Sequence, residues 1–224
     1  AFQINDAQQF NELIQITRDQ IDYIVKPFLE LVQNRADAPP EVTDPSIMCL
    51  AESGMYGAQC TLEGYCYGDD VHIYGIIDSF RRINPTSLSR YEYPTILPRE
   101  IQERMIHSAV RIMEQIGLRN FPFNIEFFYS QTSDSITMLE INPRISLGHI
   151  DLFEKVHGVS HLSIMVDLAL GREPRPLPDE GKYRKAAHFL VRTPDSGTVH
   201  RVPNQKEIDK VRTRYPDTEV LLEV

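Results

Sequence analysis

Three side chains that could do chemistry stand at alternate positions of one apolar stretch, LEINPR, as Glu140, Asn142 and Arg144. The apolar residues between them are typical of a strand that packs on a core. Successive side chains of a strand point to opposite faces, so these three groups share one face. A surface strand usually carries mixed Lys, Thr and Glu for solubility, and this set differs from that pattern. The carboxylate, amide and guanidinium therefore point together at one place.

A second acidic strand, FNIEFFY, precedes this one and is joined to it by the turn SQTSDS. If the strands pair antiparallel across that turn in the register in which the numbers of opposite residues sum to 266, Glu126 lies opposite Glu140 and Asn124 lies opposite Asn142. Directly opposed side chains have Cβ atoms about 5 Å apart, where like charges are destabilising. Two carboxylates placed so need a cation or a shared proton. Oxygen ligands from Glu126, Glu140 and Asn142 suit Mg²⁺ or Mn²⁺, which keep coordination places for phosphate oxygens.

A solvated sheet face with ordinary glutamates is the alternative interpretation of the same residues. A register shifted by one residue would set Glu126 and Glu140 diagonally or on opposite faces. The pattern alone leaves both interpretations open.

The composition limits the class of protein. The chain has 224 residues, of which 42% are hydrophobic and 25% charged, as is ordinary for a soluble globular protein. The net charge of −9 argues against nucleic-acid or anionic-membrane partners. The three cysteines, Cys49, Cys60 and Cys66, form no CxxC pair and leave an odd thiol, which favours a reducing compartment such as the cytoplasm. No apolar run approaches the length of a membrane span.

The elements that must hold these groups read as an α+β fold with an antiparallel sheet. The spacing predicts helices over 7–34 (with a break at Pro27), 99–117, 151–156, 160–171 and 205–215. It predicts strands over 1–4, 46–52, 59–67, 71–80, 123–129, 135–142, 185–193, 197–203 and 219–224. Residues 81–98 show no periodicity and are predicted to form a long functional loop. We expect one domain over 1–175 and a small α/β extension over 176–224.

The motif LEINPRIS, preceded by IEF, resembles the metal-binding hairpin of the ATP-grasp superfamily of carboxylate–amine and carboxylate–thiol ligases, which includes biotin carboxylase and carbamoyl-phosphate synthase. The resemblance extends to about Gly171. It implies that Glu126 and Glu140 bridge two Mg²⁺ ions and that Asn142 ligates one of them. It also implies that Arg144 contacts the γ-phosphate of ATP or an acyl-phosphate intermediate. The metal ions and the guanidinium group would offset the negative charge of these phosphates.

The segment MCLAESGMYGAQCTLEGY is similar to the strand–turn–strand that holds adenine and ribose in this superfamily. The resemblance assigns Glu52 to the first acid of that motif, the Met55 backbone to the adenine edge and Gly57 to the turn. Gln59 stands where the superfamily has a ribose-binding glutamate, and Ser53 where it has a second acid or a lysine. Gln59 can still bond a ribose hydroxyl, so nucleotide binding is expected, in a weaker form or with altered base choice.

Four further residues take roles from the resemblance. Phe128 and Leu139 match the apolar positions that sandwich adenine, although simple alternation points Leu139 away from Glu140. Glu63 is in phase with the polar strand positions and is a candidate active-site or supporting carboxylate. His149 is a candidate substrate-side residue beside Arg144. The alternatives are a surface position for Glu63 and a helix-cap or interface role for His149.

The resemblance also implies parts that we do not find in these residues. Lys26 resembles the lysine that binds phosphate, but it lies in a helical stretch with no glycine-rich loop after it. We therefore expect that lysine, the glycine-rich lid and the N-terminal substrate domain to lie outside this chain. As a fragment, the chain is expected to bind ATP and Mg²⁺ weakly without catalysing ligation.

The function implied is an ATP- and Mg²⁺-dependent ligase that acts on small-molecule carboxylate and amine or thiol substrates. Association into a homo-oligomer stays open. A non-catalytic nucleotide-binding relative is one alternative, and a metal-dependent hydrolase or an oligomerisation module that uses the hairpin glutamates structurally is another.

Overall fold

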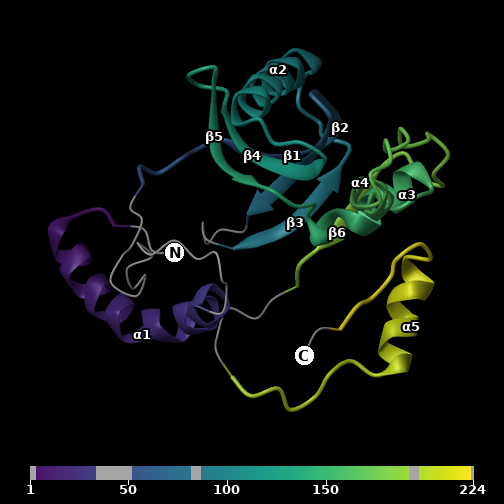
Figure 1. Ribbon diagram of the computed structural model, residues 1–224. Coiled ribbons are helices and arrows are strands. Elements are labelled where there is room, and N and C mark those ends of the chain that lie inside the picture. Colours follow the sequence, from purple (N-terminus) through teal and green to yellow (C-terminus); the bar gives the residue numbers. More distant parts are fainter. Residues whose placement is uncertain (1–3, 34–51, 82–86, 192–196, 223–224) are drawn as a thin grey trace. The chain divides into compact units, whose positions relative to one another are not determined.

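The computed structural model describes residues 4–33, 52–81, 87–191 and 197–222. Its sheet has six strands in the order β5-β4-β1-β2-β3-β6 (Figure 1). The strands are β1 (Ala58–Tyr67), β2 (Asp70–Arg81), β3 (Leu88–Tyr93), β4 (Phe121–Ser130), β5 (Ser135–Asn142) and β6 (Ala186–Phe189). The helices are α1 (Ala7–Gln33), α2 (Arg99–Ile116), α3 (Ile150–His157), α4 (Leu162–Ala169) and α5 (Gln205–Arg214). Every strand pair is antiparallel, which confirms the predicted α+β class.

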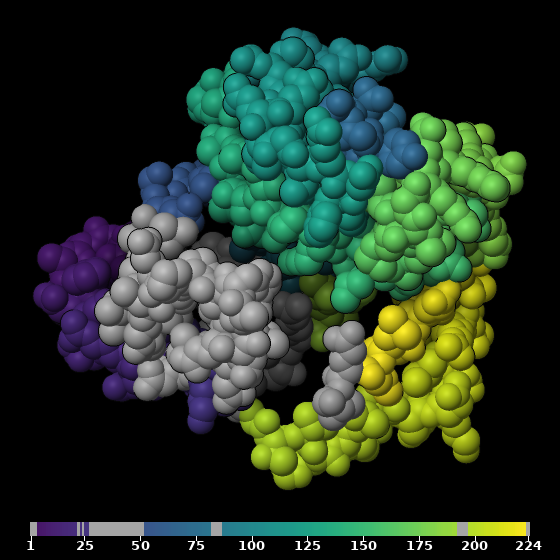
Figure 2. All heavy atoms as spheres, in the orientation of Figure 1, coloured from purple at the N-terminus to yellow at the C-terminus, as the bar shows by residue number. Residues whose placement is uncertain are grey.

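One face of the sheet packs against α2 and forms the main hydrophobic core. The buried residues of α2 recur at helical spacing, as Ile101, Met105, Ala109 and Met113. They share a cluster with alternate residues of β1 and β4, which are Cys60, Leu62, Phe123, Ile125 and Phe127. The helix ends at Gly117, whose left-handed backbone is the predicted cap. In the space-filling view the atoms of α2 form a continuous teal layer (Figure 2).

The opposite face of the sheet is covered in part by α3 and α4. Phe153 of α3 packs with Ile77 of β2 and Tyr93 of β3. Gly75 admits the helix this closely, because a Cβ atom at Gly75 would lie 2.7 Å from the ring of Phe153. As a result β1 is buried on both faces from Gln59 to Cys66. The part of the sheet near β4 and β5 keeps half-buried and exposed positions on this face.

Several predicted elements differ from those in the structure. The predicted loop 81–98 contains β3, because β2 on one side and β6 on the other supply backbone partners that the sequence does not reveal. Helix α1 continues past Pro27, where a break was predicted. Residues 197–203 and 219–222 form no strand, and β6 is shorter than the predicted 185–193. The predicted strands 1–4 and 46–52 lie almost entirely outside the described residues.

The chain divides into two compact units, Ala1–Leu190 and Val191–Val224. The first ends later than the boundary predicted at 175, because β6 pairs with β3. The second contains α5, which begins with a capping box between Asn204 and Glu207. Across the part of the chain that the structure describes, none of the helices combines the length and the apolar character needed to cross a bilayer.

Candidate functional site

The predicted pairing of the two acidic strands is confirmed by the structure. Glu126 of β4 lies opposite Glu140 of β5, and Asn124 lies opposite Asn142. The same register extends into β1, where Glu63 lies opposite Asn124. The candidate metal ligands therefore share the face of the sheet that α2 does not cover.

A β-bulge in β5 lies directly beside the paired glutamates. Glu126 pairs with Glu140, but the next pair is Phe127 with Met138, so Leu139 is an extra residue in β5. A bulge bends its strand and redirects a side chain. The alternation argument that pointed Leu139 away from Glu140 therefore does not hold at this position. Leu139 is half-buried, and its contact with adenine stays a prediction.

Glu140, Asn142 and Arg144 are connected by hydrogen bonds. The Asn142 amide donates to Glu140 Oε1 at 2.9 Å and to Asn124 Oδ1 at 3.1 Å. The Arg144 guanidinium donates to Asn142 Oδ1 at 3.4 Å. Glu140, Asn142 and Arg144 thus lie together at the edge of the sheet, as their alternate positions predicted.

Glu126 is the more enclosed of the two glutamates. Gln59 donates to Glu126 Oε2 at 2.7 Å, and Arg81 donates to Gln59 Oε1 at 2.8 Å. Burial raises the pKa of Glu126, and the charge of Glu140 raises it further against the hydrogen bond from Gln59. A bound cation would relieve both effects, so this donor set fits Mg²⁺ or Mn²⁺. Across the described residues no three His, Cys, Asp or Glu side chains are arranged so that they could hold a metal ion together, and the candidate site consists of two carboxylates and an amide.

Most of the residues assigned to the nucleotide lie at or near the start of β1. Glu52 is exposed and Met55 is half-buried in the segment before the strand, and Phe128 pairs with Gln59 across β1 and β4. Gln59 is 5% exposed, and its amide already bonds Glu126 and Arg81. Its contact with a ribose stays a prediction and would use the remaining amide proton or lone pair.

The turn before β1 requires glycine. Gly57 has φ +125°, and a Cβ atom there would lie 2.2 Å from the carbonyl oxygen of Tyr129. Gly57→Ala should lower the free energy of unfolding by about 1–3 kcal/mol, measured by urea denaturation. Gly68→Ala is the matched control, because Gly68 also has a positive φ but no atom within 4 Å of an added Cβ. An equal loss in both variants would show that the contact with Tyr129 is unimportant.

Glu63 and His149 are buried beneath the end of this face. Glu63 is 0% exposed and His149 1% exposed, and His149 Nδ1 lies 2.8 Å from Glu63 Oε1. The backbone N–H of Ser146 donates to the same oxygen at 3.2 Å. The Tyr74 hydroxyl lies 3.5 Å from Glu63 Oε2 and 3.1 Å from His161 Nδ1. Burial raises the pKa of Glu63, against the effect of its hydrogen bonds.

The surface position considered for Glu63 is therefore wrong. Glu63 and His149 are both buried and so lie below the protein surface. Tyr74 and His161 complete this cluster, and sequence reasoning missed them. Nothing in the spacing of His161 distinguishes it from the other histidines, since the hydroxyl that it contacts belongs to Tyr74 on the distant strand β2.

The buried imidazole of His161 makes stability depend on pH. Burial lowers the pKa of His161 from 6.5 to about 4, and the charge of His149 adds to the shift. As pH falls below 6.5, His161 becomes protonated in the unfolded chain, whereas in the folded chain it stays neutral until about pH 4. Stability should therefore fall by about 3 kcal/mol across that window from this residue alone.

His161→Phe isolates this contribution, because a phenyl ring can keep the stacking on Phe153. We expect the variant to lose less stability than the unchanged chain between about pH 7 and pH 4.5, as measured by urea unfolding. Glu63 has the opposite sign, since its raised pKa favours the folded chain as pH falls, but both chains share it. Parallel pH profiles of the two chains would contradict the assignment.

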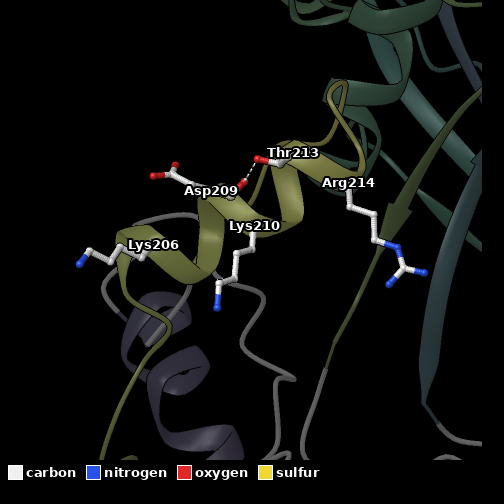
Figure 3. Close-up of a pocket in the computed structure, with 5 residues that line it drawn as sticks. All are labelled: Lys206, Asp209, Lys210, Thr213 and Arg214. Carbon is white, nitrogen blue, oxygen red and sulfur yellow. Dashed lines mark hydrogen bonds between the residues drawn. The ribbon is translucent and has the colours of Figure 1, made fainter.

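A pocket in the second unit is formed by α5 alone, and Figure 3 shows its lining residues, which are Lys206, Asp209, Lys210, Thr213 and Arg214. None of the residues of α5 is buried. A pocket without buried polar groups or walls from other elements lacks the features of a small-molecule site. The paired glutamates of the sheet remain the candidate site.

Comparisons with known proteins identify the family of this chain. A family model described as an ATP-grasp domain matches residues 3–150. Acetyl-CoA carboxylase of Schizosaccharomyces pombe is 29% identical over 150 residues, covering 62% of this chain and 6% of that protein. Carnosine synthase 1 of Gallus gallus is 36% identical over 90 residues, covering 38% of this chain and 10% of that protein.

Among solved structures, the L-amino acid ligase from Bacillus licheniformis is similar with a TM-score of 0.54 and 16% sequence identity. The similarity covers 69% of this chain and 40% of that one, and at this identity it shows the fold alone. The chain thus spans only a part of each relative. Because the family model covers more than half of the 224 residues and includes both paired glutamates, the chain belongs to the ATP-grasp domain family.

Proposed function

We propose that this chain forms the ATP and metal site of a ligase that joins a small-molecule carboxylate to an amine or a thiol. The observation that carries the proposal is the opposed pair Glu126 and Glu140, with Asn142 and Arg144 hydrogen-bonded beside it. Family membership supports ATP as the nucleotide.

Glu126, Glu140 and Asn142 would hold Mg²⁺ or Mn²⁺. The ion, when bound, supplies positive charge that offsets the phosphate oxygens. The protein's own part is to place the ligands, since β4 and β5 fix the two carboxylates opposite each other before any ion binds.

Arg144 would bind the γ-phosphate, which is the group that moves. In the proposed reaction the γ-phosphoryl group is transferred to a carboxylate oxygen of the substrate, giving ADP and an acyl phosphate. The amine or thiol then attacks the acyl carbon, and inorganic phosphate leaves. Arg144 would stabilise the charge on the phosphoryl oxygens in both steps.

The nucleotide base and sugar would lie at the start of β1. Glu52, the Met55 backbone and Gln59 would contact adenine and ribose, and Phe128 and Leu139 would enclose the ring. Small-molecule substrates, self-association and a cytoplasmic location remain parts of the proposal.

Isothermal titration of the 224-residue chain with ATP, in Mg²⁺ and in excess EDTA, tests this function. We expect binding that depends on Mg²⁺ and is absent with EDTA. ATP binding without any effect of Mg²⁺, or metal binding without nucleotide, would contradict the proposal.

A non-catalytic nucleotide-binding role is the second candidate, and Gln59 favours it. The superfamily resemblance expects a carboxylate there, whereas this chain has a neutral amide that bonds Glu126. Assays of ADP release by the full-length protein, with mixtures of carboxylates and amines, would separate the two candidates, because only the ligase releases ADP.

A further inference from the structure

The segment after β5 carries Arg144, and its backbone is attached to the sheet more firmly than the arginine side chain is. Arg144 is exposed, and two of its contacts, to Asn142 Oδ1 at 3.4 Å and to the carbonyl of Ile145 at 3.5 Å, are long for hydrogen bonds. Contacts of this length do little to fix a guanidinium. Its position must therefore come largely from the backbone.

Two polar side chains of the sheet hold that backbone. Asn124 of β4 donates to the carbonyl oxygen of Arg144 at 2.9 Å. Glu63 of β1 accepts the N–H of Ser146 at 3.2 Å, and its Oε1 atom also contacts His149 Nδ1 at 2.8 Å. Glu63 and Asn124 lie opposite each other in the β1–β4 pair. The segment from Arg144 to His149 is thus bonded to neighbouring positions of one rigid sheet.

Stability alone does not explain why a buried carboxylate, that of Glu63, accepts the hydrogen bond from Ser146. This carboxylate is 0% exposed in a strand whose other buried residues include Leu62 and Cys66. Burying a carboxylate is costly, and replacing a buried ionic pair by apolar residues is often neutral or stabilising. Such pairs serve best where they select one geometry among several. Here the geometry selected is that of the segment that carries Arg144.

The packing around His149 enforces the same geometry. The edge of its ring meets Tyr91, with ring centroids 4.8 Å apart. His149 is therefore held from two sides, by Glu63 through a hydrogen bond and by Tyr91 through its ring.

We propose that Glu63 and His149 are positioning residues that hold Arg144 in place for the γ-phosphate of the nucleotide. Neither residue touches the phosphate in this role, and both act through the backbone of residues 144–149. The inference rests on the proposed function, in which Arg144 binds that phosphate.

The ratio of ATP affinity to ADP affinity in Mg²⁺ tests this role, because only ATP has the γ-phosphate. Arg144→Ala should reduce the ratio by about tenfold to hundredfold, the value of one charged hydrogen bond. Glu63→Leu should reduce it by about tenfold, because the carboxylate that accepts from Ser146 is lost. Glu63→Gln should restore it to within about threefold, because an amide oxygen can accept from Ser146 and His149 while the NH₂ donates to Tyr74.

A role in stability alone would not move this ratio. Tyr93→Phe is the control, because it removes a different part-buried hydrogen bond to an imidazole, from Tyr93 to His157 at 2.7 Å, and neither residue belongs to the segment 144–149. We expect its ratio to be unchanged. The double variant of Glu63→Leu and Arg144→Ala should lose no more than Arg144→Ala alone, because both changes remove the same contact. If Glu63→Leu does not fold, His149→Phe keeps the ring beside Tyr91 and should lower the ratio by a similar factor.

Two different failures can be told apart. A normal ratio in Glu63→Leu or His149→Phe, together with a reduced ratio in Arg144→Ala, would overturn the positioning role and leave the proposed function standing. An unchanged ratio in Arg144→Ala, or no ATP binding by the unchanged chain, would overturn the proposed function and this inference with it.

Discussion

Glu140→Gln is expected to abolish metal binding by this chain while leaving the fold intact. The variant keeps the shape of the side chain and an oxygen for the hydrogen bond from Asn142, but it removes one of two negative charges at the site. Partners outside the ligand shell are already worth about 10–100-fold in metal affinity, so loss of a ligand carboxylate should cost about hundredfold or more. Manganese titration followed by electron paramagnetic resonance measures the change.

The same variant should not weaken the metal-free protein. Glu140 faces Glu126, whose pKa is raised by burial first and by this neighbouring charge in addition. Removing the charge relieves a like-charge contact across the strand pair, so the free energy of unfolding without metal should stay equal or rise slightly. Glu114→Gln, at an exposed position of α2, is the matched control and should change neither property. Unaltered manganese affinity in Glu140→Gln would remove the basis for the metal site.

Phe153→Ala is expected to give the largest loss of stability among single changes outside the site. Phe153 is 0% exposed, and its ring centroid lies 4.5 Å from that of Tyr93 and 4.6 Å from that of His161. It fixes α3 against β2 directly over Gly75, which has no side chain of its own to fill the space. Truncation of a buried phenylalanine removes about 3–5 kcal/mol, and the rigid aromatic neighbours limit collapse of the cavity.

Urea denaturation measures this loss, with Phe121→Ala as the control. Phe121 begins β4 and is 42% exposed, so its truncation should cost about 1 kcal/mol or less. Similar losses in both variants would show that α3 is not held to the sheet by Phe153. The substitution Phe153→Ala should also leave His161 less firmly packed, because His161 stacks on the phenylalanine ring that is removed.

Local sequence determined the parts of this protein that depend on near neighbours. Strand alternation placed Glu140, Asn142 and Arg144 together, and the predicted register placed Glu126 opposite Glu140 correctly, although the turn itself pairs Ser130 with Ser135 and the bulge at Leu139 supplies the shift of one residue. The helix that ends at Gly117 followed from apolar spacing and a glycine cap. In both cases the interacting residues are close in the chain, so the local pattern indicates which elements meet. The exact partner of Glu126 also needed the bulge, because the register at the turn alone would pair Glu126 with Leu139.

The tertiary structure alone decided the rest. The bulge at Leu139 lies in β5 where it pairs with β4. Strand β3 exists because β2 and β6 complete its hydrogen bonds. Glu63 and His149 are 86 positions apart and meet only because the segment after β5 crosses β1. No periodicity encodes such a contact, since it depends on how separate strands and helices pack, and that packing is fixed by burial across the whole core.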